Sequence, residues 1–503
     1  MHLKLLLHTI VHLRPKQAFY QLWYRLYNPQ YKAFEAPEGV VSKLQTESIP
    51  RNHCLDGDVF VFLNLEHHFA GWNFTDNGML WAYNQNYFDW INQEGIAEEE
   101  CCKWIDKFIE EQPQNKIGLD PYPIALRSIN WIKFFCRFPE DATKPRLDSL
   151  FSQVKLLEKK LEYHLLGNHL LEDTYALYIA ANFFQDTKLL KKASKLLLSQ
   201  LKEQTLPDGA HYEQSPMYHC ILLDRLLDCI NMAPNDELKA FAKKQIGWLK
   251  SICFQDGSFP MFNDAALGIA PVPNDIIDYA RRLGIESEAA PLKESGYRKM
   301  SNNIMEAFVD VGNVTATYQP GHTHADTFNY ELRINGNPFI IDTGISTYNK
   351  TERRQYERST VAHNTVTINN QNSSEVWGGF RVANRAIVTL LTDASDKVSA
   401  SHNGFGSTTH KRTFTMTEDG FGITDELSSS VNAINYIHFA PEIKVLSYTN
   451  KCIVTSMGNV EIDGADEVTI KDEKASNTYN QFHDIKKAQI HFNTKLNYSV
   501  KVN

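Results

Sequence analysis

The hydrophobic period of the chain changes near residue 296, and this change constrains the fold more than any single motif does. Between about residues 80 and 284, apolar residues recur every three or four positions in runs such as PYPIALRSINWIKFFCRF, which is typical of amphipathic helices. From Tyr297 to Asn503 they alternate with polar residues in runs such as FNYELRI and KRTFTMT, between Asn, Gly and Asp turns. The sequence therefore predicts an α+β multidomain protein, with roughly eight or nine paired helices in a curved array or toroid and then an antiparallel sandwich of two sheets.

The predicted division has three parts: residues 1–55, 56–295 and 296–503. The first is an amphipathic helix, broken at Pro15, and an extended segment. After Pro15 it has an apolar stripe and several basic residues, so a helix that lies on a membrane or on the protein itself stays open. The stripe is formed by Phe19, Leu22, Trp23 and Leu26.

Charge, cysteine pattern and the N-terminal residues indicate which partners and which cellular location to expect. Net charge is −9 without a long basic run, so nucleic acid is not an expected partner. The eight cysteines show no CxxC pair, which favours buried thiols in a reducing compartment. The apolar run Leu5–Val11 is interrupted by His8 and makes a poor signal peptide. We therefore expect a cytoplasmic protein, with a periplasmic or membrane-associated location as the alternative.

Histidines and aspartates gather at the start of the predicted sandwich, between Tyr318 and Asn364. His322 and His324 lie two positions apart, so on a strand they share one face. Asp342 and His363 follow further along the chain. Two histidines and one aspartate from neighbouring strands suit a divalent ion such as zinc, although incidental histidines in a β-sheet are the more common case.

Three segments of the helical part carry further polar candidates. In LLGNHLLED, Asn168 and His169 precede an apolar run, where an N-cap role for Asn168 is an equal alternative. LPDGAHYEQSPMYH contains Glu213 and Tyr218, and DGSFPMFNDAA contains Asp264, an N-cap or a site carboxylate. No Gly-x-Ser-x-Gly elbow or phosphate-binding loop is present. A cleft between the two large domains is the expected location of a site.

The ordered segments GNHLLED, DGAHYEQSPMYH, GHTHAD, FIIDTG and YERSTVAHNTV make the chain resemble the heparinase II/III-like polysaccharide lyases and their alginate-lyase relatives. The resemblance covers most of the chain. It implies an incomplete (α/α) toroid followed by a C-terminal antiparallel β-sandwich. It also implies cleavage of an acidic, uronic-acid-containing polysaccharide by β-elimination, in which the C5 proton is removed and the C4 glycosidic oxygen is expelled.

The resemblance assigns roles to individual residues. Asn168, with His169, would stabilise the enolate-like charge that develops on the uronate. Tyr218 and His322 would supply the base and the acid, in an order that the sequence leaves open. Tyr348 is a further candidate for catalysis. The remaining assignments are Glu213, Arg358 and Tyr356 for substrate and His324, Asp342 and His363 for a structural zinc.

Other interpretations stay open. Arg353 and Arg354 suit either a carboxylate or sulfate of the substrate or ordinary surface salt bridges. A noncatalytic glycan-binding or assembly protein of surface-polysaccharide biosynthesis would keep the fold without the proton-transfer groups. A glycoside hydrolase on the same scaffold would need two carboxylates across the scissile bond. The most plausible candidates for this carboxylate pair are Asp208, Glu213 and Asp264.

Overall fold

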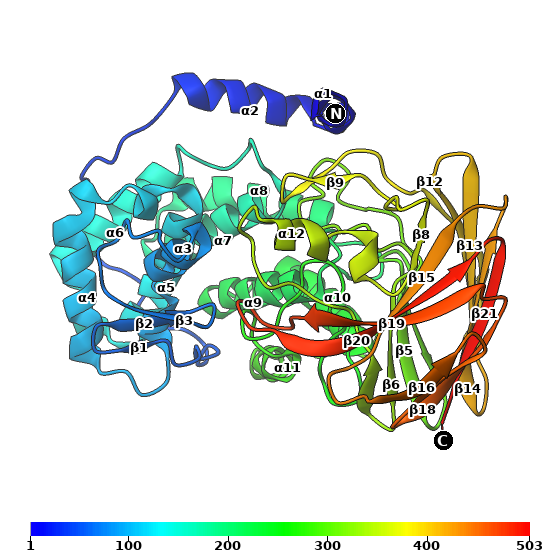
Figure 1. The fold of residues 1–503 in the computed structure, drawn as a ribbon. Coiled ribbons are helices and arrows are strands. Elements are labelled where there is room, and N and C mark those ends of the chain that lie inside the picture. The colour runs from blue at the N-terminus through cyan, green and yellow to red at the C-terminus, as the bar shows by residue number, and fades with distance from the viewer. Residues whose placement is uncertain (1, 503) are drawn as a thin grey trace.

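The computed structural model describes residues 2–502 and begins with two helices that form a layer of their own above the rest (Figure 1). They are α1 (His2–Ile10) and α2 (Pro15–Leu26), so the helix restarts at Pro15, where a proline fits the first turn. An extended segment then leads to a small antiparallel sheet. Its strands are β1 (Leu55–Asp56), β2 (Val59–Phe62) and β3 (Leu65–His68).

Helices paired along the chain form the next part of the molecule, as the 3.6-residue period predicts. The longest are 17 or 18 residues, and in the described chain this part has nine α-helices. They are α3 (Met79–Tyr87), α4 (Glu98–Glu111), α5 (Pro121–Arg137), α6 (Lys144–Leu157), α7 (Gly167–Phe183), α8 (Thr187–Gln204), α9 (Pro216–Met232), α10 (Asp236–Ile252) and α11 (Pro273–Arg282). Short 3₁₀ turns are η1 (Asp89–Asn92), η2 (Gln112–Gln114), η3 (Ile117–Leu119) and η4 (Pro139–Asp141).

The helices α5, α7 and α9 occupy the middle of this array. Most residues of the three are buried, charged side chains such as Arg127 and Asp224 included, as expected of helices surrounded by other helices. The outer helices α8 and α10 instead bury one stripe and expose lysines on the other face. The central helices α7 and α9 therefore have fixed positions, and their N-terminal ends carry two of the predicted site residues, Asn168 and Tyr218.

The C-terminal part is a β-sandwich whose strands all pair antiparallel. An eight-stranded sheet has the order β11-β12-β13-β14-β21-β18-β17-β16, and two four-stranded sheets have the orders β19-β20-β15-β8 and β4-β5-β6-β7. The strands β9 (Val376–Trp377) and β10 (Arg381–Val382) pair separately, and the short helices α12 (Glu352–Glu357) and η5 (Thr360–Ala362) precede β8.

The remaining strands are β4 (Tyr297–Ser301), β5 (Met305–Asp310), β6 (Tyr330–Ile334), β7 (Asn337–Ile340), β8 (Val366–Ile368), β11 (Val388–Asp393), β12 (Lys397–Phe405), β13 (Thr408–Met416), β14 (Gly420–Leu427), β15 (Ala433–His438), β16 (Val445–Thr449), β17 (Cys452–Thr455), β18 (Gly458–Asp463), β19 (Glu467–Ala475), β20 (His483–Phe492) and β21 (Lys495–Val502). The sequence predicted a sandwich of two sheets, and the strands pair into one eight-stranded and two four-stranded sheets. The two four-stranded sheets are joined by a bridge between Ile340 and Phe439, and they share one apolar core with the eight-stranded sheet.

The architecture of an (α/α) toroid followed by an antiparallel β-sandwich confirms the predicted fold class. The last toroid helix ends at Arg282 and the first sandwich strand begins at Tyr297. Gln214, in the loop before α9, ties the two parts together by donating to the carbonyls of Ser295 at 2.8 Å and Asn313 at 3.0 Å. Within the described residues, no helix has the length and hydrophobicity that crossing a bilayer requires.

Arg412 on β13 is a fully buried cation of the sandwich. Its Nε and Nη2 atoms bond the two carboxylate oxygens of Asp425 at 2.7 and 2.8 Å, and Nη1 donates to the carbonyls of Phe328 and Asn364. Burial raises the pKa of Asp425, but the adjacent Arg412 outweighs this and brings the pKa to about 2. Through Arg412, the eight-stranded sheet therefore holds the loop that leads from His363 into β8.

Replacing Arg412 with methionine should destabilise the sandwich by about 3–5 kcal/mol, because the buried Asp425 carboxylate loses its cation and keeps the contact with His410 at 2.6 Å. The neighbouring Lys411→Met change provides the control. Lys411 pairs with Glu426 at 2.7 Å near the surface, so its loss should cost under about 1 kcal/mol. Urea unfolding followed by circular dichroism measures both, and equal losses would contradict the predicted importance of the buried pair.

Candidate active site

Local backbone geometry at two helix starts presents Asn168 and Tyr218. The helix α7 begins at Gly167, whose φ is +60°. A Cβ atom there would lie 2.6 Å from Glu213 Oε1, so the close approach of these segments requires glycine. The alternative N-cap role of Asn168 is wrong, because this residue lies inside the first turn.

The start of α9 is fixed by Ser215, whose hydroxyl accepts a hydrogen bond from Tyr218 N at 3.2 Å, and by Pro216 in the first turn. Ser215 also donates to the carbonyl of Asp264 at 2.6 Å. The loop that carries Asp264 is thereby held against the turn that carries Tyr218.

Glu213 holds Asn168 by two hydrogen bonds. The backbone N of Asn168 donates to Oε1 at 2.9 Å, and the side-chain Nδ2 donates to Oε2 at 2.8 Å. Both residues are buried, and Asn168 Nδ2 lies 3.4 Å from His322 Nε2. The amide of the toroid therefore reaches the histidine of the sandwich, and Glu213 orients it.

His322 lies at the centre of the predicted catalytic residues. Its Nδ1 atom is 2.8 Å from Asp264 Oδ2 and 3.4 Å from the hydroxyl of Tyr348. The ring of Tyr218 packs on the imidazole with centroids 3.9 Å apart, and its hydroxyl is 3.3 Å from that of Tyr348. The structure thus brings Asn168, Tyr218, His322 and Tyr348 into one connected cluster.

A buried ion pair lies beneath this cluster. The guanidinium of Arg354 binds both carboxylate oxygens of Asp264, with Nη2 2.7 Å from Oδ2. His324 Nε2 is 2.8 Å from the other oxygen, and the two charged side chains are fully buried. Burial raises the pKa of Asp264, but Arg354 and the two histidines together hold it well below its ordinary value. Asp264, a residue of the toroid, therefore stays ionised, and its carboxylate interacts with three side chains of the sandwich.

No sequence pattern distinguishes Arg354 from its neighbours. It lies in α12, which has six residues, and a helix of this length shows no periodic stripe from which the buried face can be inferred. Arg354 also lies 90 positions from its partner Asp264. Of the two partners, Asp264 was predicted from the sequence, as either an N-cap or a site carboxylate.

The hydroxyls of Tyr218 and Tyr348 are neutral donors at physiological pH. Burial is the main reason that the pKa of each is raised far above that of free tyrosine. The charge of Asp264 acts in the same direction on both. Each phenol therefore keeps its proton until a reacting group with developing negative charge accepts it.

Other predicted residues lie around the cluster rather than in it. His169 Nδ1 is 3.1 Å from Glu162 Oε2, and its ring packs against Tyr122. The hydroxyl of Tyr356 donates to Glu473 and accepts from a lysine of the sandwich. Arg358 is fully buried and donates to the carbonyl of Thr323 at 2.8 Å, so as placed it does not face a polymer.

The predicted zinc ligands share one buried region. His363 Nδ1 is 2.7 Å from Asp342 Oδ2, and the rings of His324 and His363 lie 5.3 Å apart. His324 Nδ1 and His363 Nε2 lack hydrogen-bond partners, as nitrogens that bind a metal would. Asp342, however, accepts hydrogen bonds from Asn329 and Gly344, and no three His, Cys, Asp or Glu residues within 2–502 are arranged to hold a metal. The three side chains as placed therefore do not form a closed zinc site, and a structural zinc stays a prediction of the sequence.

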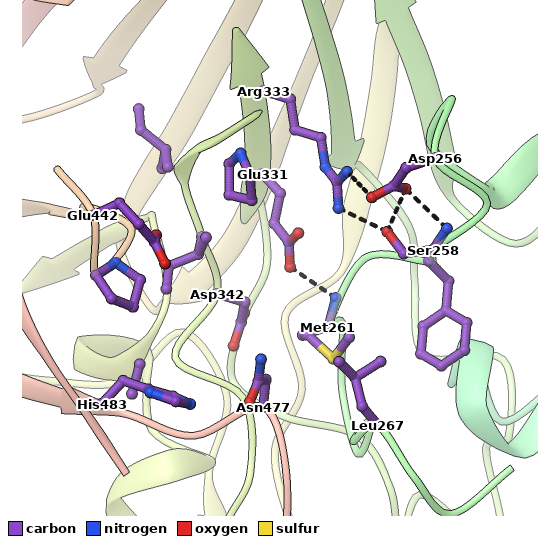
Figure 2. Close-up of a pocket in the computed structure, with 16 residues that line it drawn as sticks. Asp256, Ser258, Met261, Leu267, Glu331, Arg333, Asp342, Glu442, Asn477 and His483 are labelled. Carbon is purple, nitrogen blue, oxygen red and sulfur yellow. Dashed lines mark hydrogen bonds and ion pairs between the residues drawn. The ribbon is translucent and has the colours of Figure 1, made fainter. Parts of the chain in front are cut away.

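A separate cavity of about 310 Å³ lies between the toroid segment 256–267 and the sandwich (Figure 2). Asp342 contributes to its wall together with Glu331 and Asp256, which pairs with Arg333. Burial raises the pKa of Glu331 to about 8, although its Oε1 atom accepts a hydrogen bond from Met261 N at 2.7 Å. The predicted catalytic residues do not line this cavity.

Two curated relatives are similar to this chain over much of its length. A heparin-sulfate lyase of Bacteroides stercoris is 24% identical over 443 residues, which cover 73% of this chain and 65% of the relative. A heparin-sulfate lyase of Pedobacter heparinus is 27% identical over 360 residues, which cover 60% of this chain and 53% of the relative. The alignments thus span about half to two thirds of the curated relatives.

The fold is also that of a solved heparinase III structure. It superposes with a TM-score of 0.66 at 14% identity, covering 96% of this chain and 89% of that one. The family model described as Heparinase II/III N-terminus matches residues 124–281, and the model described as Heparinase II/III-like, C-terminal matches residues 285–502. Together they account for most of the toroid and almost all of the sandwich, and the chain belongs to the heparinase II/III-like family.

Proposed function

We propose that the protein is a polysaccharide lyase that cleaves an acidic, uronic-acid-containing polysaccharide by β-elimination. The observation that carries this proposal is the connected cluster of Asn168, Tyr218, His322 and Tyr348 where the toroid meets the sandwich. The cluster supplies neutral donors and a proton acceptor side by side. The curated relatives are heparin-sulfate lyases, which supports a glycosaminoglycan as the substrate class.

Elimination begins with removal of the proton at C5, which is weakly acidic while the neighbouring carboxylate is negative. Hydrogen-bond donors must therefore stabilise the charge that spreads onto the carboxylate as the proton leaves. In the proposed mechanism the amide of Asn168 does this, because Glu213 fixes it with Nδ2 beside the proton acceptor. The amide itself stays neutral throughout.

We assign the base to His322 and the acid to Tyr218. With Nδ1 protonated and directed at the Asp264 carboxylate, the imidazole keeps Nε2, beside Asn168 Nδ2, as the unprotonated nitrogen that accepts the C5 proton. The C4–O bond then breaks, a C4–C5 double bond forms, and the leaving oxygen takes the proton of Tyr218. The raised pKa of Tyr218 suits this role, because the phenol is fully protonated before the reaction.

The buried pair of Asp264 and Arg354 also argues against a hydrolase. Inverting and retaining hydrolases need one carboxylic acid that carries a proton and a second carboxylate across the scissile bond. Asp264 has a lowered pKa and binds Arg354, while Asp208 accepts hydrogen bonds from Ser295 at 2.7 and 2.9 Å. Neither is placed as a general acid. A noncatalytic glycan-binding protein would not need the hydrogen-bonded Tyr218, His322 and Tyr348.

The lyase proposal predicts an unsaturated uronyl product that absorbs in the ultraviolet. Heparan sulfate, heparin, chondroitin sulfate and alginate would be incubated with the protein while this absorbance is followed. Tyr218→Phe and His322→Ala should each lower the rate by about 10²–10⁴-fold, because each removes a proton-transfer group. Asn168→Ala should lower it by about 10²–10³-fold through loss of charge stabilisation.

Tyr448→Phe is the matched control, because this tyrosine is exposed on β16 and should leave the rate unchanged. Circular dichroism of each variant checks that it has folded. Release of reducing sugar without the chromophore would identify a hydrolase. Binding of a polysaccharide without any product would identify the noncatalytic alternative.

We also propose a structural zinc ion, on the basis of the family resemblance and of the two nitrogens His324 Nδ1 and His363 Nε2 that lack hydrogen-bond partners. Elemental analysis of protein purified without chelators should then find one zinc per chain, and His324→Ala and His363→Ala should each lower that ratio. His402→Ala is the control, because His402 is a buried histidine of β12 that interacts with His410 instead. Fully active wild-type protein without a metal would contradict the zinc prediction while leaving the lyase proposal intact.

A further inference from the structure

The N-terminal helices expose their apolar stripes to solvent. In α1 and α2 the exposed residues recur at the same spacing of three, four and seven positions, which is one face of a helix. Leu3 is 70% exposed and Leu26 is 87% exposed. The two stripes consist of Leu3, Leu6, Leu7 and Ile10 in α1 and of Phe19, Leu22, Trp23 and Leu26 in α2.

The opposite faces of both helices bind the body of the protein through polar contacts. Gln17, which is almost completely buried, donates to the carbonyls of Leu165 at 3.1 Å and Tyr318 at 3.3 Å. Tyr24 donates to the carbonyl of Leu161, and Thr9 accepts from Trp377 Nε1 at 3.1 Å. These contacts reach both the toroid and the sandwich, so they fix which face of the layer points outward (Figure 1).

This orientation is the reverse of what a surface helix usually shows. An amphipathic helix of a globular protein turns its apolar stripe to the core, and a contiguous exposed apolar patch marks an interaction site. Here the apolar stripes are outside and hydrogen-bonding side chains are inside. Aromatic rings also line the α2 stripe, where Phe19 stacks on Trp23 and Trp23 lies against Tyr27.

The charge of the same segment is opposite to that of the whole chain. Residues 1–34 contain five lysines and arginines and no aspartate or glutamate, whereas the protein has a net charge of −9. Lys4 and Arg25 are exposed beside the stripes. Helices with leucine and tryptophan on one face and basic residues beside it bind the boundary between headgroups and acyl chains of anionic membranes.

We infer that α1 and α2 dock the protein onto an anionic lipid surface, with the two apolar stripes in the headgroup boundary and Lys4, Arg25 and Lys32 near the lipid phosphates. Charge favours lipid over a second copy of the chain. A symmetric dimer through this patch would place two acid-free basic segments against each other, which like-charge repulsion opposes. The inference is independent of the proposed lyase reaction.

The test uses the full chain and two kinds of vesicle, one of phosphatidylcholine alone and one with added phosphatidylglycerol. In co-sedimentation, the wild-type protein should bind the anionic vesicles and bind them more weakly at high salt, because salt screens the basic residues. Leu22→Glu should lower the partition coefficient at least about tenfold, because it places a charge in the apolar stripe. Leu22 is 62% exposed, so this change should not affect folding.

Gln21→Glu is the matched control, because it adds the same charge at the preceding position, which is exposed but outside the stripe. Its partition coefficient should stay within about threefold of the wild-type value, because only one charge is added near the surface. The inference fails if the wild-type protein does not bind anionic vesicles or if both variants lose binding equally. It also fails if light scattering shows a wild-type dimer that Leu22→Glu converts to a monomer.

Discussion

The buried ion pair between Asp264 and Arg354 is the interaction on which the candidate site depends. Asp264 comes from the loops of the toroid and Arg354 from the short helix α12 of the sandwich. Both side chains are fully buried. An unpaired charge in the protein interior costs several kcal/mol, so each requires the other. Asp264 then has oxygens in contact with His322 and His324, and this fixes the imidazole that faces Asn168 and Tyr218. The candidate site is therefore complete only when the toroid and the sandwich are docked.

Much of this could be predicted from the sequence, for reasons that differ between parts of the chain. The change of hydrophobic period predicted the toroid and the sandwich, because each period reflects one buried face per element. Asn168, Tyr218 and His322 were predicted from short motifs that resemble a family. Arg354 was assigned to substrate or to a surface salt bridge, and its burial was missed, because the partner Asp264 lies 90 residues away and leaves no local pattern. Arg358 was predicted to bind substrate but is buried against a backbone carbonyl.

The N-terminal helices show a second limit of sequence patterns. The stripe Phe19, Leu22, Trp23, Leu26 predicts a helix correctly, but periodicity alone does not say whether the apolar face meets a core or solvent. The structure decides this through Gln17 and Tyr24, polar residues that face the protein and leave the apolar stripe outside. A polar side chain buried with satisfied hydrogen bonds can thus orient a helix as firmly as apolar packing does.

A crystal structure of the Tyr218→Phe protein with a bound acidic oligosaccharide tests the central claim most directly. The account predicts a uronate carboxylate within hydrogen-bonding distance of Asn168 Nδ2, with the C5 hydrogen directed at His322 and the glycosidic oxygen beside residue 218. An oligosaccharide held instead in the cavity lined by Asp256 and Glu331, with no sugar near Asn168, would contradict it.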